Sequence, residues 1–295
     1  MREATKLHWP FVRNRSIAQS RGLIAWWPGA CPGAAVNIDA AGDNGNHMSF
    51  ISFANPFTTA SGWTAGKDGG RSAIIFDGVN DLCQLSTSLS SRFFYFGAAT
   101  PWTISCWINV LAQPSNTHGF IAGCRIIGLG NGYATYWEKA TSTVLVFYEG
   151  INNLYQQRNS SALSLNTWYH VAFTRDSSNT TGGMLIYING VADAGTTSGN
   201  GTPNDFSPIS SPVFCMGNDA NNNTYPNNCI MEDLRVYNRA LSAAEVASMY
   251  KIDTRWALRW RPTRIATRIN QSTGGPWPHF GRRARGLSGG MITMG

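Results

Sequence analysis

The sequence predicts an all-β protein built from two packed antiparallel sheets, and three observations predict it. Only 13% of the residues are charged, 43% are hydrophobic, and 31 glycines interrupt the chain. Several short segments alternate polar and apolar residues with a period of two, which is typical of strands. Ser, Thr, Asn and Gly fill the spaces between them, as in a protein with many turns. Short strands that need partners on both faces imply two sheets packed face to face.

The predicted strands follow one another from residue 71 to residue 239. The run 71–86, "RSAIIFDGVNDLCQLS", predicts a strand, a Gly turn and a second strand. The run 102–110, "WTISCWINV", predicts a longer strand, and 142–150 predicts another. We expect the remaining segments to form two hairpins, which pair 166–176 with 183–195 and 211–219 with 229–239.

One short helix is predicted at 242–250, directly after the last strand. Ser242 and Glu245 form a Ser-x-x-Glu capping box ahead of the apolar residues Val246 and Met249. A helix of one to two turns is not stable alone in water. We therefore expect it to dock on the sandwich or on a partner.

The distribution of charge divides the chain into an acidic domain and two basic arms. Residues 1–21 carry a net charge of +4, residues 22–250 carry −5, and residues 251–295 carry +8. Basic terminal arms usually bind something acidic, such as nucleic acid, a membrane surface or a neighbouring acidic subunit. The sequence thus predicts an N-terminal arm at 1–21, an all-β domain at 22–250 and a C-terminal arm at 251–295.

The N-terminal segment and the cysteines favour folding in a cytoplasm. No apolar run of signal-peptide length opens the chain, and no stretch approaches the roughly 18 apolar residues of a membrane span. We therefore expect no membrane partner. Of the six cysteines, Cys83, Cys106, Cys124 and Cys215 lie in strand-like runs, where free buried thiols are expected. A Cys215–Cys229 disulfide is the alternative, and no Cys/His spacing indicates zinc.

The order of the strand motifs resembles the laminin-G-like, concanavalin A-like jelly-roll domains. The resemblance covers residues 22–250, and its most specific part is the ending "MEDLRVYNRALSAAEVASMY" at 231–250, where family members close with a strand, "R-x-Y-N-R-A-L-S" and a helix. It implies a two-sheet antiparallel jelly roll closed by the short C-terminal helix. The earlier motifs are "GLIAWWPG", "AIIFDGVND", "WTISCWINV", "NTWYHVAFTRD" and "LIYINGV".

Catalysis is not expected from the acidic residues. Glucanases of the concanavalin A-like fold carry Glu-x-Asp-x-Glu on one strand, which supplies two carboxyl groups roughly 5–5.5 Å apart. That motif is absent here. Glu232 and Asp233 are adjacent and should point to opposite faces of a strand, while Glu138 and Glu149 are isolated in sequence. We predict that the chain is not an enzyme.

The resemblance also implies a calcium site at one edge of the sandwich. Hard cations take carboxylate, amide and carbonyl oxygens. The matching positions are Asp77, Asn80 and Asp81, with Glu232 or Asp233 on the closing strand. Such a calcium ion would be structural, because no nucleophile is at hand. The alternative is that Asp77 to Asp81 simply form the turn, for which these residue types are suited.

A carbohydrate site is the second candidate, because exposed aromatic rings stack on sugars while amides and charged groups bond the hydroxyls. The loop "NDANNNTYPNNC" at 218–229 is rich in amides. Trp26, Trp102, Trp107 and Trp168 lie in strand runs and are expected in the core. The candidate rings in loops are Trp63, Tyr133, Tyr136, Trp137, Tyr155 and Tyr225.

The arms interleave basic and aromatic residues. Such a pattern could bind single-stranded nucleic acid, but it also suits an extended arm whose tryptophans fill pockets on neighbouring subunits while its arginines pair with acids. A plain disordered tail is a third interpretation, although disordered segments contain few aromatic residues. The residues expected to anchor the arms are Trp9, Phe11, Arg13, Trp256, Arg259, Trp260, Arg261, Trp277, Arg282 and Arg283.

Together these features predict a structural protein of a large assembly, with the arms as anchors and the jelly roll outward. The arm–domain–arm layout is similar to virion proteins of tailed bacteriophages, such as a capsid decoration, fibre or tail subunit, with copies of itself and other subunits as partners. The outward domain could bind a glycan. The alternatives are a secreted bacterial carbohydrate-binding module and a glycosidase. Fold alone does not decide among them.

Overall fold

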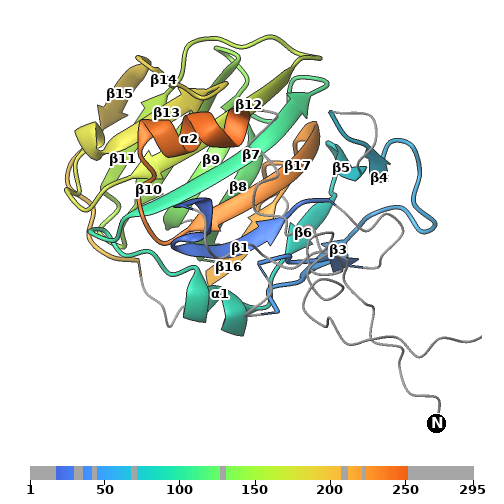
Figure 1. The fold of residues 1–295 in the computed structure, drawn as a ribbon, viewed down its shortest axis with the longest axis horizontal. Helices are drawn as coiled ribbons and strands as arrows, with labels where there is room; N and C mark the ends of the chain where they lie inside the picture. Colours follow the sequence, from blue (N-terminus) through green and yellow to red (C-terminus); the bar gives the residue numbers. More distant parts are fainter. Residues whose placement is uncertain are drawn as a thin grey trace, which may run out of the picture. The chain divides into compact units, whose positions relative to one another are not determined.

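A computed structural model describes residues 18–29, 36–41, 45–67, 72–126, 131–206, 212–220 and 224–251. Within these residues two antiparallel sheets pack face to face, which confirms the predicted all-β sandwich (Figure 1). The eight-stranded sheet runs in space as β14 (Val191–Asp193), β13 (Met184–Ile188), β12 (Trp168–Arg175), β7 (Trp102–Val110), β17 (Asn228–Tyr237), β5 (Ser72–Asp77) and β4 (Gly62–Ala65), and β1 (Leu23–Trp27) also pairs with β17.

The second sheet holds nine of the described strands. In spatial order they are β15 (Thr196–Gly199), β11 (Tyr155–Asn159), β10 (Thr143–Glu149), β9 (Gly132–Glu138), β8 (His118–Ile126), β16 (Pro212–Met216), β6 (Leu82–Gln84), β3 (Met48–Ile51) and β2 (Val36–Asn37). The core lies between the two sheets and takes alternate residues from each. Trp102 and Trp107 are buried as predicted, whereas Trp168 is only half-buried.

The predicted helix is confirmed as α2 (Ala243–Tyr250), with Ser242 as N-cap and the complete capping box. A second helix, α1 (Thr87–Phe93), was not predicted; Ser86 caps it. Two short 3₁₀ turns, η1 (Ala18–Ser20) and η2 (Thr181–Gly183), complete the described elements.

In two of the predicted strand pairs, the two strands of the pair belong to different sheets. The hairpin of β12 with β13 forms as expected, but β5 and β6 separate at the turn, and so do β16 and β17. Each connection crosses from one sheet to the other, because an alternating pattern identifies a strand but not the sheet that receives it. Cys215 and Cys229 are therefore free buried thiols on different sheets, and the disulfide alternative is wrong.

Helix α2 lies across the outer face of the eight-stranded sheet (Figure 1). Val246 and Met249 are buried there with Trp26 and Tyr237 in an apolar cluster that is separate from the main core. The helix thus adds a third layer to the two-sheet sandwich, and its apolar face is covered. Docking supplies the stability that so short a helix lacks alone.

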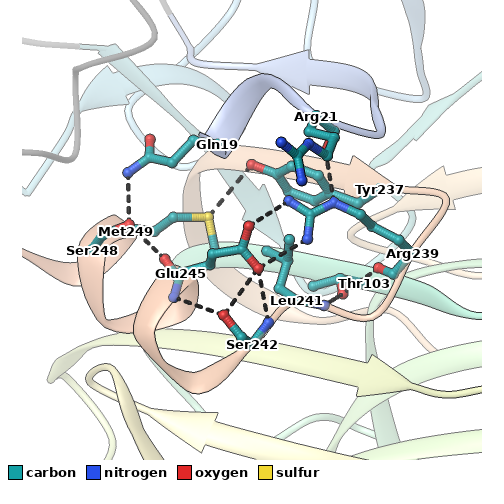
Figure 2. A network of polar contacts seen from close by, with 10 residues as sticks. All are labelled: Gln19, Arg21, Thr103, Tyr237, Arg239, Leu241, Ser242, Glu245, Ser248 and Met249. Atoms are coloured by element: carbon teal, nitrogen blue, oxygen red, sulfur yellow. Dashed lines mark hydrogen bonds and ion pairs between the residues drawn. The ribbon is translucent and has the colours of Figure 1, made fainter. Parts of the chain in front are cut away.

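Arg239 is the centre of the polar network that holds α2 in place (Figure 2). Its Nη1 and Nη2 donate to the two carboxylate oxygens of Glu245 at 2.9 and 2.7 Å. Its Nε donates to the carbonyl oxygen of Arg21 at 2.8 Å, and its own carbonyl accepts from Thr103 Oγ1 at 2.8 Å. One residue therefore joins β7, the helix and the N-terminal edge of the domain.

A second set of bonds ties the helix itself to the domain (Figure 2). Glu245 Oε2 accepts from the Ser242 backbone N–H and hydroxyl, both at 3.0 Å. Gln19 Nε2 donates to Ser248 Oγ at 2.9 Å. The motif "NRALSAAE" therefore encodes a latch, in which Arg239, the Ser242 cap and Glu245 act together.

Strand β17 carries a bulge where its two acidic residues lie. Asp233 has a positive φ of 59°, and the pairing with β7 shifts between Glu232 and Arg235. Asp233 bonds Arg235 and the indole N–H of Trp26, while Glu232 accepts from the backbone N–H of Lys67. Both carboxylates thus lie on the α2 side of the sheet, and the prediction that they point to opposite faces is wrong because of the bulge.

Candidate functional site

The outer face of the nine-stranded sheet carries a cluster of polar and aromatic side chains. Strands β8 to β11 alternate in their centres, so Tyr133 and Tyr148 enter the core while Tyr136 and Phe147 face outward. Tyr136 lies opposite Phe120 on β8 and Leu145 on β10. These residues form an apolar floor over which charged and ring-bearing side chains lie.

Arg125 anchors the polar part of this face. Its Nη1 donates to the hydroxyl of Tyr136 at 2.7 Å and to Asp219 Oδ2 at 2.9 Å. The Arg125 and Asp219 side chains are only 11% and 2% exposed. Burial alone would lower the pKa of Arg125, but Tyr136, Asp219, Tyr225 and Glu149 around it raise that pKa. The guanidinium is therefore held charged and in a fixed position.

Glu149, at the end of β10, adds a second carboxylate near Arg125. Burial raises its pKa, and the charge of Arg125 opposes that rise. The residue is half-buried, and it lies opposite Tyr155 on β11. It can accept a hydrogen bond from a ligand that reaches this face.

Two groups of half-buried rings flank the charged network. Tyr225 stands edge-on to Tyr136, with ring centroids 5.5 Å apart. Arg125 lies 5.9 Å from the centroid of the Tyr225 ring. On the other side Phe147 and Tyr155 stack at 5.4 Å with 29° between their planes. Half-buried aromatic rings beside fixed polar groups combine an apolar surface with oriented hydrogen-bonding groups.

A histidine–carboxylate pair extends the face along β8 and β9. His118 Nε2 lies 2.6 Å from Glu138 Oε2, with side chains 30% and 16% exposed. The His118 ring also stands edge-on to Tyr225 at 5.9 Å. We call Arg125, Asp219, Tyr225, Tyr155 and Glu149 the outer-face site, with His118 and Glu138 at its margin.

The predicted carbohydrate residues fall into three places. Tyr155 and Tyr225 are half-buried on the outer-face site, and their contact with a glycan stays a prediction. Tyr133 and Trp137 are 0% and 1% exposed in the main core, so their assignment to a sugar site is wrong. They belong to strand β9 rather than to a loop. Tyr136 is buried beneath Tyr225, and Trp63 lies apart, on β4.

Sequence reasoning missed Arg125, Asp219 and Glu149 as site residues. Asp219 belongs to the amide-rich loop that drew attention, but nothing local marks the others. Arg125 is one arginine in a strand run, and only the pairing of β8 with β16 brings it to Asp219. The signal that could find them is an outward charge on an otherwise apolar strand.

The five predicted calcium positions do not come together. Asp77 Oδ1 accepts from the backbone N–H of Val79 at 2.8 Å, and Asp81 Oδ2 accepts from that of Asp77 at 3.0 Å. Glu232 and Asp233 lie on the α2 side, with the partners given above. Among the residues that the structure describes, no group of three or more Asp, Glu, His or Cys side chains could hold a metal ion. The turn interpretation accounts for Asp77 and Asp81, and a calcium ion there stays a prediction.

The predicted arm residues lie outside the described residues. They are Trp9, Phe11, Arg13, Trp256, Arg259, Trp260, Arg261, Trp277, Arg282 and Arg283.

No described helix is long and apolar enough to cross a membrane.

Comparison with known families identifies the fold family. The model of the concanavalin A-like lectin/glucanases superfamily, of the Laminin_G_3 type, matches residues 77–247, more than half of the chain. The chain belongs to this superfamily. It therefore carries a lectin/glucanase-like domain, as the order of its motifs predicted. A comparison with curated protein sequences finds no match.

Several solved structures share the fold. The binding domain of Paraclostridial Mosquitocidal Protein 1 is 15% identical, with a TM-score of 0.55, over 79% of this chain and 52% of that one. Trypanosoma rangeli sialidase in complex with sialic acid is 14% identical, with a TM-score of 0.54, over 78% of this chain and 32% of that one. The receptor binding domain of botulinum neurotoxin mosaic serotype C/D is 15% identical, with a TM-score of 0.54, over 79% and 51%.

These likenesses show the fold alone. The chain corresponds to about half of each toxin domain and a third of the sialidase chain. The same fold therefore occurs both in an enzyme and in binding domains.

Proposed function

We propose that this chain is a non-enzymatic carbohydrate-binding subunit whose outer-face site receives a glycan. The observation that carries the proposal is the Arg125–Asp219–Tyr136 network held beside the half-buried ring of Tyr225. Its charged groups are fixed before any ligand arrives, which lowers the entropic cost of binding. A sugar would stack on a tyrosine ring and exchange hydrogen bonds with the charged groups.

Each part of the site suits one feature of a sugar. Tyr225 and the Phe147–Tyr155 stack offer flat apolar surfaces to the C–H face of a pyranose ring. Glu149 accepts from hydroxyl groups, and Arg125 and Asp219 supply charge-assisted bonds, which are stronger than neutral ones. Both ring groups come from strands or a loop fixed to them, so their spacing is set by the sheet.

The solved neighbours support a binding role without deciding it. One is a sialidase in complex with sialic acid, and others are binding domains of toxins. The glucanase motif Glu-x-Asp-x-Glu is absent from the sequence. We therefore favour recognition over hydrolysis for this chain.

The context that we propose is a large assembly, of which a bacteriophage virion is the leading example. An acidic domain between two basic, aromatic-rich arms suits a subunit that is fixed by its arms and presents its domain outward. The same outer-face site would serve a secreted carbohydrate-binding module, which would be monomeric. Oligomeric state in solution separates the two contexts.

Glycan-array binding by the full chain tests the glycan site, followed by calorimetry on the best ligand. Tyr225→Ala and Arg125→Lys should each raise the dissociation constant tenfold or more, since buried Tyr and Arg contacts are commonly worth about 2 kcal/mol. Tyr250→Ala is the matched control, because Tyr250 is 39% exposed on α2, over the other sheet. Unchanged affinity in both site variants, or equal loss in the control, would refute the assignment.

A further inference from the structure

The end of β3 and the loop that follows it enclose a cavity away from the outer-face site. Its volume is about 500 Å³, within the range of roughly 300–1,000 Å³ that is usual for binding pockets. Its lining comes from one continuous segment, which contributes three half-buried phenylalanine rings. The lining residues are Phe50, Ser52, Phe53, Ala54, Asn55, Pro56 and Phe57.

The aromatic walls of this cavity are fixed by contacts behind them. Phe50 meets Phe53, Phe57 and Trp63 edge-to-face, with centroids 4.8, 5.4 and 5.5 Å apart. Phe53 also touches Phe76 of the main core at 5.4 Å. A Cβ on Gly62 would lie 2.6 Å from the Cβ of Phe57, so glycine is needed where the ring packs. The walls therefore exist before a ligand enters.

Acidic groups lie close to the aromatic walls. The backbone N–H of Ala54, which lines the cavity, donates to Ser61 Oγ, and Ser61 Oγ donates to Asp81 Oδ1 at 3.0 Å. Asp77 is half-buried at the other end of the same turn. Neither carboxylate lines the cavity, and Asp81 is only 2% exposed, so both add to the negative charge of the domain without contacting a ligand. An aromatic cavity in an acidic domain suits a ligand that combines a flat apolar ring with positive charge.

The chain itself contains a segment of that chemistry. Residues 255–261, "RWALRWR", place Trp256 and Trp260 between arginines. They belong to the arm that carries +8, whereas residues 22–250 carry −5. The 44 residues after Lys251 could extend about 145 Å when stretched, which is enough to reach a neighbouring molecule.

We infer that this cavity receives a tryptophan of segment 255–261 from a second copy of the chain. The inference rests on the assembly part of the proposed function, not on the glycan site. Each copy would offer one cavity and donate one arm. Reciprocal exchange of arms would close a pair, and a succession of arms from copy to copy would build a ring or a filament.

Sedimentation velocity of the full chain tests this inference. Wild type should sediment as an oligomer, and Ala54→Arg should weaken association at least tenfold, because it places bulk and positive charge in the cavity. Trp256→Ala combined with Trp260→Ala should do the same. Ala60 is exposed in the same loop but does not line the cavity, so Ala60→Arg is the control and should assemble like wild type.

Competition with a peptide of residues 252–264 tests the inference without any mutation in the cavity. At about 100 µM it should compete with the arm and dissociate the wild-type oligomer. The inference is overturned if wild type is monomeric, if Ala54→Arg stays assembled while the arm variant dissociates, or if the peptide has no effect. Glycan affinity measured on the same variants should not change, so a loss of assembly and a loss of glycan binding remain distinguishable.

Discussion

At the scale of single residues, the charges that matter most are those whose environment differs between the folded and unfolded chain. Glu245 and Asp39 show this in opposite directions. Glu245 is stabilised in its charged form by the latch, whereas Asp39 is buried with its charge only partly compensated. Each therefore gives stability a pH dependence of its own sign.

Glu245 should make the domain less stable in acid. The hydrogen bonds from Arg239 lower its pKa from 4.5 to about 2, against the effect of burial. Its contribution is fully present above pH 4.5 and is lost as pH falls towards 2. Glu245→Gln should remove roughly 1–2 kcal/mol at pH 7, because solvent screens this partly exposed pair, and flatten the stability profile in this window. Urea unfolding at a series of pH values measures both effects, and an unchanged profile would argue against the latch.

Asp39 should act the other way. Burial raises its pKa from 3.8 to about 6, although its Oδ1 accepts from the backbone N–H groups of Trp26 and Ala41, both at 2.8 Å. The folded state then binds the proton more tightly than the unfolded state, so its contribution to stability falls as pH rises from about 4 to 6. Asp39→Asn should abolish that fall, worth roughly 2–3 kcal/mol. If the variant keeps the wild-type slope between pH 4 and 7, Asp39 is not its cause.

At the scale of elements, the closing helix depends on its cap and on its docking. The capping box was visible in the sequence because Ser242 and Glu245 are local, and the structure forms it as expected. Ser242→Ala should cost about 1 kcal/mol of unfolding free energy, since the Ser242 side chain accepts the N–H of Glu245. Chemical denaturation measures this cost. Ala244→Ser, at an exposed position of the same helix, is the control and should change stability by less than about 0.5 kcal/mol.

Alternation predicted the strand segments of β5, β6, β7, β10, β12, β13, β16 and β17, but it predicted neither β9 nor β11, nor the sheet that receives each strand. Segments 71–86 and 211–239 look like hairpins, yet each turn crosses the sandwich. Tyr133 and Trp137 looked like loop residues because the β9 segment carries polar residues in both orientations. The bulge at Asp233 could not be predicted either. Asp233 accepts a hydrogen bond from Trp26, which is distant in sequence, and another from Arg235, two residues along the same strand.

At the scale of the whole molecule, the two sides of the sandwich differ in what covers them. The helix and its latch close the outer face of the eight-stranded sheet, with Val246 and Met249 buried. The opposite outer face keeps half-buried rings and charged groups at Tyr225, Tyr155 and Glu149. The sequence named Tyr155 and Tyr225 as candidate rings, and their contact with a glycan stays a prediction, whereas Arg125 and Asp219 meet only through the folded sheet. The site is therefore a property of strand order as much as of residue type.

The most direct test of the glycan site is chemical-shift mapping on the labelled full chain, titrated with the best glycan from the array. The account predicts that the perturbed amides and side chains cluster on β8 to β11 and around Asp219 and Tyr225. Shifts confined to the α2 side, or no saturable shifts at millimolar glycan, would contradict it.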